Sequence, residues 1–422
     1  MDTLDALIRL HRATGNTAWL RAALMPGAEA ARAIPSAGFT GTPGEPPLPA
    51  PASPAALLHE SEAAWRRRGA PAGLRRLTED AEAAAAVDAV RRWLAGGRDR
   101  HAIGWDDPAY PSLLREAPSP PLLLFVEGQP ERLWWPQVAV VGSRSPTPAG
   151  RERAGRWARA FADAGYVVTS GLASGIDAAA HGAALASPGT IAVTATGPDR
   201  CFPTAHRSLH AAIVRDGAIA TEHPPGTPAR REHFPRRNRI IAGLALATVV
   251  VEAAERSGAL ITARLAAEAG RDVFALPGAP ENLKARGCHR LIRDGAALVD
   301  DPAQVLEAIG AASGRVGASL RQRLDLAERR MPAGGAPSRR GDDPVSRDLF
   351  DGDEAVHARV DAALGRDGAR FDELLARSGL TPATLAPILL AMELDGRLTQ
   401  QHGVYLPCGS APPTRAGLQR RR

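Results

Sequence analysis

The chain has 422 residues, of which 44% are hydrophobic and 23% charged, so it is long enough for two to three globular domains. Its 52 basic and 46 acidic residues leave a formal net charge of +6, which favours an anionic partner. Three cysteines without CxxC spacing, Cys201, Cys288 and Cys408, argue against a disulfide framework or a zinc site and for a reducing cytoplasm.

Residues 1–104 are expected to form an N-terminal helical region of the SAM or helix-hairpin-helix kind. Apolar residues recur there at helical spacing, and a proline-rich loop at 35–54 separates two helical stretches. Asp2 and Asp5 do not fit the basic and then apolar start of a signal peptide. The region contains no grouping of catalytic side chains, so we expect a role in packing or contact.

From residue 138 onward, short β-branched runs alternate with alanine-rich helical stretches, which predicts a doubly wound α/β domain over about 137–310. Its longest apolar run, 245–254, is too short to cross a bilayer, so we expect no membrane contact. The predicted strands are 138–141, 166–169, 190–194, 218–221, 248–252 and 272–275. The predicted helices are 148–164, 174–186, 205–215, 236–245, 259–269 and 281–294.

Residues 311–350 are rich in Gly, Arg, Ser, Asp and Pro and predict a disordered linker. Residues 351–408 predict a winged-helix domain, because a helix near Glu354, a second over 372–377, a third opened by Thr381-Pro382 and a hairpin over 398–406 follow in that order. The segment 409–422 is expected to be a basic tail.

The first strand of the α/β domain runs directly into Gly142, Ser143 and Arg144. Loops at the carboxyl ends of parallel strands face the ligand crevice of such a sheet. Glycine lets the backbone approach a phosphate, serine donates a hydrogen bond, and arginine makes a two-pronged charged contact. A phosphate site and a purely structural turn are both open at this point.

The second strand ends in a turn that contains Ser170, Gly171 and Gly175. The helix after this turn offers free N–H groups to an anion. Asp177 would either cap that helix or bind a ribose or a base. The turn is a second candidate for phosphate binding.

The loop after the third strand carries Phe202, His206 and Arg207. An aromatic ring beside arginine on a ligand-facing loop suits stacking on a base. The alternative is that Phe202 packs the loop onto the domain.

An arginine-rich run carries the strongest charge in the chain and leads into an apolar helix. At a helix start these arginines oppose the helix dipole, and an anionic partner would relieve that conflict. The alternative is a solvated surface run. The residues expected to bind here are Arg236, Arg237, Asn238 and Arg239, and those of the next turn are Ser257, Gly258 and Thr262.

Catalytic and cofactor motifs are absent from the sequence. It has no serine-histidine-aspartate order with an oxyanion turn, no His/Cys metal spacing, no GxxxxGK[ST] motif and no paired carboxylates. We therefore predict no catalytic residue, no metal and no cofactor, and a crevice that holds phosphates.

Several of these segments, taken in order, resemble the DNA-processing protein A family (DprA, also called Smf). They are the run Val138 to Arg144, Ser170-Gly171 through Asp177, Phe234 to Leu244, Ser257 to Thr262, and Pro277-Gly278. The resemblance covers residues 105–310. It implies an extended Rossmann-like domain that binds single-stranded DNA and has no catalytic step.

The resemblance also implies a homodimer that protects incoming DNA and helps load RecA during natural transformation. Ser143 and Arg144 would grip phosphate, and the glycines of the second turn would line the pocket. The sequence departs from the family at His206 and His289, where asparagine is usual. These departures put the base contacts in doubt.

Two other functions compete with this one. A nucleotide- or nucleotide-sugar-processing enzyme of a related fold would usually carry a Pro-Gly-Gly-x-Gly-Thr turn, whereas this chain has Pro277-Gly278-Ala279-Pro280. A duplex-DNA regulator would read bases through the third helix of the winged domain. That helix, predicted over 381–395, is apolar and acidic and has no arginine.

Overall fold

The computed structural model describes residues 2–14, 23, 51, 53–68, 70, 78–185, 189–330, 353–365, 368–380, 385, 389, 392, 398–401 and 404–407. It divides into two compact units, Met1–Pro332 and Ala333–Arg422. Within the described part of the chain, no helix has the length and apolar character needed to cross a membrane.

A nine-stranded sheet forms the centre of the first unit, in the order β1-β2-β6-β5-β4-β3-β7-β8-β9, and its last strand, β9, is Ala297–Leu298. The six predicted strands are all present, and neighbouring members pair in parallel, which confirms the α/β fold. They are β3 Gln137–Val141, β4 Val167–Ser170, β5 Thr190–Val193, β6 Ala218–Thr221, β7 Ala247–Val250 and β8 Asp272–Ala275.

The chain runs outward from β3 through β4, β5 and β6, and then returns to the other side of β3 as β7. The strand order therefore reverses between the neighbouring strands β3 and β7. Ligands of doubly wound sheets bind in the crevice at the carboxyl ends of the strands at such a reversal.

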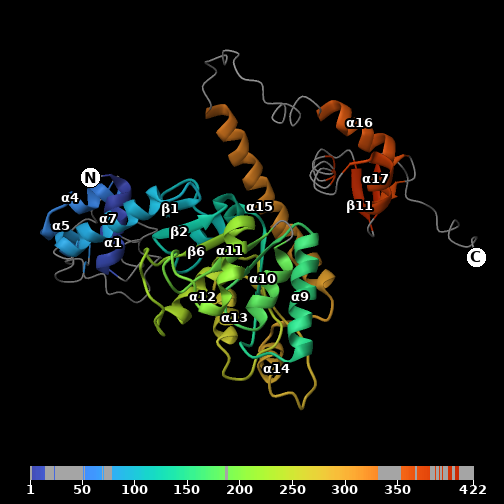
Figure 1. Cartoon of the computed structure of the whole chain (residues 1–422), viewed down its shortest axis with the longest axis horizontal. Helices are drawn as coiled ribbons and strands as arrows, with labels where there is room; N and C mark the ends of the chain where they lie inside the picture. Colours follow the sequence, from blue (N-terminus) through green and yellow to red (C-terminus); the bar gives the residue numbers. More distant parts are fainter. Residues whose placement is uncertain are drawn as a thin grey trace, which may run out of the picture. The chain divides into compact units, whose positions relative to one another are not determined.

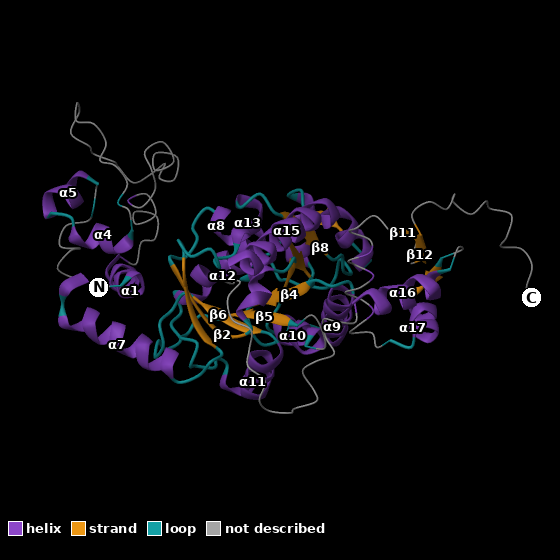
Figure 2. Ribbon diagram, turned by 90° about the horizontal axis from the view of Figure 1, so that it is seen from above, coloured by secondary structure: helices purple, strands orange, loops and turns teal. Residues whose placement is uncertain are grey.

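Two layers of helices cover the sheet, because alternate residues of each strand point to opposite faces. Val138 and Val140 pack on α9 Pro148–Asp163 and α10 Ile176–Ala184. Ala139 and Val141 face the layer that contains α12 His233–Leu244 and α13 Ala259–Glu268. Figure 2 shows α12 and α13 on one side of the strands and α10 and α11 (Arg207–Asp216) on the other.

Two antiparallel strands that the sequence did not predict extend the sheet beyond β6. They are β1 Arg100–Gly104 and β2 Leu123–Gly128. Helices α1 Thr3–Thr14 and α7 Ala81–Ala95 lie beside them (Figure 1) and bury Leu123 and Phe125. The N-terminal helices therefore pack directly on the sheet. The shorter helices α4 Pro54–His59 and α5 Glu62–Arg67 complete the described helices of this region.

The last helix of the first unit, α15 Pro302–Arg330, runs through residues 311–330, for which the composition predicted a linker. Val305 and Ile309 are buried against α9, and Val316 packs on the same cluster. This apolar stripe at helical spacing explains why the helix continues past residue 310. The rest of the predicted linker, 331–350, lies outside the described residues.

The second unit has the predicted order of a winged helix. Helices α16 Asp353–Leu364 and α17 Phe371–Ser378 precede a hairpin of β11 Leu398–Gln401 and β12 Val404–Pro407, with β10 Ala369–Arg370 on the outer side of β12. In the predicted third helix the structure describes Leu385, Leu389 and Met392, which are buried at helical spacing. Thr381-Pro382 and the tail 409–422 lie outside the described residues.

Candidate nucleic-acid interface

A cleft of about 560 Å³ opens at the carboxyl ends of β3 and β7, where the strand order reverses. Three of the predicted turns and the start of α12 meet there, although they are up to 120 residues apart in sequence. The predicted site residues that line the cleft are Gly142, Ser143, Arg144, Asp177, Arg237, Asn238, Ser257, Gly258 and Thr262.

The turn after β3 is fixed to its neighbours through its backbone. The amide of Ser143 donates to the carbonyl oxygen of Glu252 at 2.6 Å, and the carbonyl oxygen of Ser143 accepts from Ile176 N at 3.1 Å. The buried carboxylate of Glu252 accepts from Thr147 Oγ1 at 2.6 Å. The Ser143 hydroxyl oxygen accepts from Ser145 N at 3.2 Å, and no described residue accepts the hydroxyl hydrogen, which is therefore available to an anion in the cleft.

Arg237 forms part of the cleft wall and is only 5% exposed. Its Nη2 donates to Gly171 O at 2.9 Å. Asp177 accepts from Gly171 N at 3.1 Å and from Ala173 N at 3.3 Å, so both side chains hold the turn after β4. The main role of the Arg237 side chain is therefore to hold the backbone conformation of the turn after β4.

Burial acts on both charges of this turn in opposite directions. It lowers the pKa of Arg237 to about 10, while the nearby charge of Asp177 raises it. Burial raises the pKa of Asp177, and the positive charge of Arg237 lowers it. Arg237 stays protonated at neutral pH and supplies positive potential to the cleft.

The glycines of the β4 turn serve close packing. A Cβ on Gly171 would lie 1.5 Å from Arg237 Nη1, so a side chain here would force the Arg237 guanidinium out of its position. Gly175 has a φ of +90°, and a Cβ there would lie 2.4 Å from Ser143 O. Ser170 is buried and donates to Val140 O at 2.6 Å. Ser170, Gly171 and Gly175 thus support the cleft from behind and do not line it.

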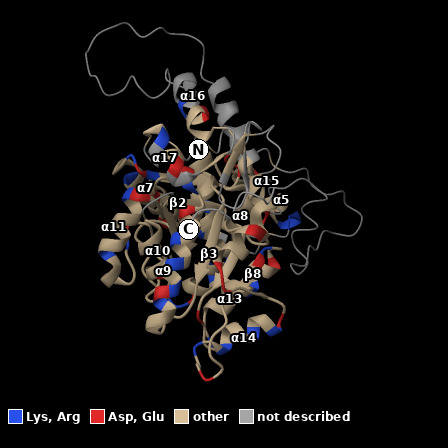
Figure 3. Cartoon of the chain, turned by 90° about the vertical axis from the view of Figure 1, so that its right-hand side faces the viewer, with Lys and Arg blue, Asp and Glu red and all other residues tan. Residues whose placement is uncertain are grey.

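Basic residues are spread over α9, α11 and α14 Arg286–Arg293 (Figure 3), so charge alone does not locate a binding site. Arg239 is paired with Glu222 through contacts of 2.6 and 2.8 Å, which neutralises its charge. Several exposed arginines make no ion pair with any described residue. Among them, Arg144 and Arg256 line the cleft, and Arg207 and Arg236 lie on the elements beside it.

Two aromatic rings stand beside the cleft. Phe234 lines it and lies 5.6 Å from Phe202, measured between ring centroids. Phe234 also contacts Arg144, whose guanidinium carbon lies 5.4 Å from the centroid of the Phe234 ring. Phe202 packs on Phe234 and yet remains 45% exposed, so its position is compatible both with packing the loop onto the domain and with stacking on a base. His206 lies behind this pair, with Nδ1 3.0 Å from Leu172 O.

The remaining wall comes from α12 and the turn before α13. Asn238 Nδ2 donates to Gly258 O at 3.4 Å, and Ser257 Oγ accepts from Ala259 N at 3.3 Å. Thr262 is buried in the first turns of α13. Asn238 thus links α12 to the turn after β7 and keeps the two sides of the cleft at a fixed separation.

Phe234, Arg256 and Glu252 were not predicted as site residues. Phe234 directly precedes the arginine run, and Arg256 directly precedes the Ser257-Gly258 turn, so their positions in the sequence were a usable signal. Glu252 gave no such signal, because its partner Thr147 is 105 residues away.

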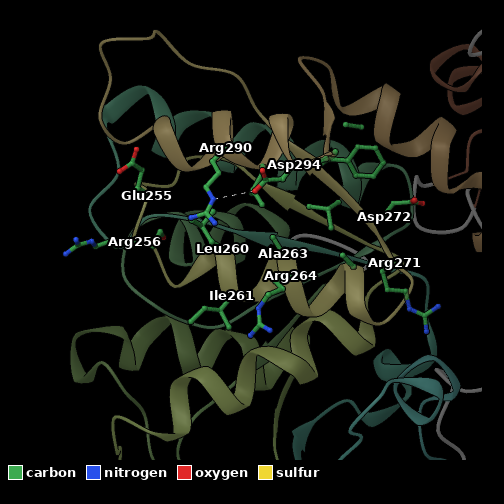
Figure 4. Close-up of a pocket in the computed structure, with 18 of the residues that line it drawn as sticks. Glu255, Arg256, Leu260, Ile261, Ala263, Arg264, Arg271, Asp272, Arg290 and Asp294 are labelled. Atoms are coloured by element: carbon green, nitrogen blue, oxygen red, sulfur yellow. Dashed lines mark ion pairs between the residues drawn. The ribbon is translucent and has the colours of Figure 1, made fainter. Parts of the chain in front are cut away.

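A larger groove of about 980 Å³ adjoins the cleft and shares Arg256 with it (Figure 4). Its apolar lining residues include Leu260, Val273 and Leu291. Arg290 pairs with Asp294 at 3.4 Å, as drawn in Figure 4, and Arg264 pairs with Glu268 at 2.8 Å. Apart from Arg256, the arginines that line the groove have carboxylate partners, so the groove suits a protein contact better than a phosphate backbone.

His181 lies fully buried beneath the β4 turn. Its Nε2 accepts from Leu172 N at 3.3 Å, and its Nδ1 donates to Thr190 Oγ1 at 2.7 Å. Burial, followed by the nearby charges of Arg237 and His206, lowers the pKa of His181 from 6.5 to about 3. The imidazole is therefore neutral in the folded protein.

This neutral histidine predicts a loss of stability in mild acid. As the pH falls below 6.5, the unfolded chain binds a proton at His181 that the folded chain does not bind, so the free energy of unfolding decreases. The difference between pH 7 and pH 5 is about 2 kcal/mol for this group. Urea unfolding at both pH values should show a decrease smaller by that amount in His181→Gln, whereas equal decreases would contradict the assignment.

The structure offers neither a metal site nor an unengaged acid or base in the cleft. No group of three His, Cys, Asp or Glu side chains arranged to hold a metal occurs in the described ranges. Asp177 is the one carboxylate among the residues that line the cleft, and its bonds to backbone amides engage it. The arrangement is suited to hold an anion.

Two family models match the chain: DNA recombination-mediator protein A over residues 101–310, and the DprA winged helix domain over residues 342–404. Protein Smf of Synechocystis is 36% identical over 311 residues, which cover 71% of this chain and 78% of that protein. DNA processing protein DprA of Streptococcus pneumoniae is 45% identical over 201 residues, which cover 47% of this chain and 71% of that protein.

Among solved structures, DNA processing protein A of Helicobacter pylori is 27% identical and has a TM-score of 0.45. The match covers 48% of this chain and 93% of that one. That protein was solved to describe its single-stranded DNA binding mode.

Proposed function

This chain belongs to the DNA recombination-mediator protein A family, and from that premise we propose that it binds single-stranded DNA in the cleft at the ends of β3 and β7. The observation that carries the proposal is the set of exposed arginines without ion pairs, of which Arg144 and Arg256 line the cleft. A cation that has no carboxylate partner is available to neutralise a phosphate.

The aromatic pair favours a single strand over a duplex. Stacking on an exposed ring such as Phe202 requires a base that is unpaired and turned outward. Phe234 contacts both that ring and Arg144, so a phosphate and its base can be held together. A duplex keeps its bases stacked inside and could use only the charges.

The function needs no chemistry on the DNA. Asp177 is held by backbone amides, and Arg237 by a carbonyl oxygen, so neither is placed to move a proton. The alternative is a nucleotide-processing enzyme. Incubation with nucleoside monophosphates followed by detection of free base decides between them, since an enzyme of that kind releases base and a binding protein does not.

Arg144→Ala is expected to weaken binding of a fluorescent oligo(dT) by about 1–3 kcal/mol, the range for a hydrogen bond to a charged group. The matched control is Arg215→Ala, which removes an exposed arginine already paired with Asp216 at 2.6 Å. The control should bind as the unmodified protein does. Fluorescence anisotropy measures both, and an unchanged affinity of Arg144→Ala would remove this residue from the site.

Competition between oligo(dT) and a duplex of equal length tests the proposed function itself. We expect the single strand to win, because only it can stack on Phe202. A preference for the duplex would favour a regulator that acts through the winged-helix domain.

We further propose that the protein acts in the cytoplasm as a homodimer, protects incoming single strands and helps load RecA during natural transformation. This part rests on the family alone. A pull-down of RecA with and without single-stranded DNA tests it, and no capture under either condition would oppose it. The domain limits 1–104, 105–310, 311–350, 351–408 and 409–422 are likewise proposed, with α15 occupying the start of the third segment.

A further inference from the structure

Leu172 has both of its backbone polar groups bonded to histidine side chains. Its amide donates to His181 Nε2 at 3.3 Å, and its carbonyl oxygen accepts from His206 Nδ1 at 3.0 Å. A carbonyl oxygen has no proton to give, so His206 carries its hydrogen on Nδ1. Leu172 is fully buried and has a φ of +55°, a conformation that leucine rarely adopts.

This strained turn sits directly behind the cleft. Gly171, the preceding residue, accepts from Arg237, and the amides on both sides of Leu172 donate to Asp177. Backbone held in a sparsely populated conformation persists only where the surroundings fix it. The histidine bonds to Leu172 are part of what fixes it here.

The other end of the His206 bond is the loop that carries Phe202. Within that loop the hydrogen bonds are internal: Cys201 Sγ donates to Pro203 O at 3.3 Å, and His206 N donates to Pro203 O at 3.0 Å. The bond from His206 to Leu172 is the one hydrogen bond described between residues 201–206 and the turn at 170–175. It joins the Phe202 loop to the back of the cleft.

We propose that His206 is a positioning residue, which fixes Phe202 through its bond to Leu172 so that a base of the bound strand can stack there. The proposal rests on the proposed function and revises the sequence-based expectation that His206 contacts a base itself. Its Nδ1 is used inside the protein, so its effect on DNA passes through the Phe202 ring.

Two substitutions separate positioning from direct contact. His206→Ala removes the bond, whereas His206→Asn keeps a donor, because asparagine Nδ2 is as many bonds from Cα as histidine Nδ1 is. Asparagine has no counterpart of Nε2. We expect His206→Ala to lose about tenfold in affinity for oligo(dT), within the range of one base–aromatic stack. We expect His206→Asn to stay within about twofold of the unmodified protein.

The salt dependence of affinity gives a second readout. A residue that contacts phosphate lowers the slope of log K against log salt when it is removed, and a positioning residue does not. The slope of His206→Ala should therefore equal that of the unmodified protein. A lowered slope, or an equal loss in His206→Ala and His206→Asn, would mean that His206 touches the DNA and would overturn the proposal. An unchanged affinity of His206→Ala would overturn it as well.

Hydrogen exchange of the full-length protein without DNA keeps this inference separate from the proposed function. Peptides that cover 170–175 and 201–207 should exchange faster in His206→Ala and at the original rate in His206→Asn. Unchanged exchange in His206→Ala would show that the bond does not hold the loop. If the unmodified protein fails to bind oligo(dT), the proposed function falls, while the exchange result still decides the role of the His206 bond.

Discussion

Arg237→Ala is expected to destabilise the first unit by about 1–3 kcal/mol, the cost of leaving a buried polar group without its hydrogen-bond partner. The substitution removes the donor to Gly171 O and leaves the buried carboxylate of Asp177 without its compensating charge. Urea unfolding measures the loss. Arg236→Ala is the matched control, because it removes the adjacent arginine, which is exposed, and should change stability by less than about 0.5 kcal/mol.

A double substitution tests the cause. If the loss comes from an uncompensated charge, Asp177→Asn should recover part of it in the Arg237→Ala background, and the two substitutions should not be additive. Strictly additive effects would contradict the coupling. A full loss of DNA binding with unchanged stability would return Arg237 to the role of a direct phosphate ligand.

Gly175→Ala is expected to destabilise the same unit by about 3 kcal/mol, because backbone strain and overpacking each cost about 1–3 kcal/mol. The φ of +90° disfavours any side chain, and the new Cβ would lie 2.4 Å from Ser143 O and 2.8 Å from the carbonyl carbon of Arg144. Both contacts are backbone atoms of the turn after β3, so relief would require that turn to move.

Gly226→Ala separates strain from collision. Gly226 has nearly the same φ, +86°, with no atom within 4 Å of a Cβ. Gly226→Ala should reduce the free energy of unfolding by the strain contribution alone. In thermal or urea unfolding its loss of stability should therefore be smaller than that of Gly175→Ala. Equal losses in the two variants would show that the close approach to the β3 turn has no energetic weight.

The parallel core could be predicted from sequence because its strands are short apolar runs that alternate with helical stretches. β2 escaped prediction although its residues 123–126 are all buried. A short apolar run of this kind, between prolines and a glycine, fits a buried helix segment as well as a buried strand. Its pairing with β1 and β6, which depends on the fold, makes it a strand. For the part of α15 beyond residue 310, the Gly- and Arg-rich composition led to the wrong prediction of a linker. The apolar stripe from Val305 to Val316, which packs on the core, was the signal for a helix.

The sequence placed Ser143, Arg144 and Ser257 at the ends of strands, and the structure has all three lining one cleft, because parallel strands end at one edge of the sheet. The hydrogen bonds and ion pairs of the predicted arginines could not be predicted in the same way. From the sequence, Arg237 and Arg239 were expected to contribute equally to the binding of an anion. Their partners, Gly171 and Glu222, come from other turns, so pairing depends on the fold. Arg256 was not predicted as a site residue, although it directly precedes the Ser257-Gly258 turn, and it is exposed and lines the cleft.

The affinity for oligo(dT) at several salt concentrations tests the central claim most directly. If Arg144, Arg207, Arg236 and Arg256 each neutralise one phosphate, log K should fall linearly with log salt with a slope of about −3. Between 50 and 200 mM salt the affinity should then fall by about 50-fold. Binding that is tight and insensitive to salt would contradict the account.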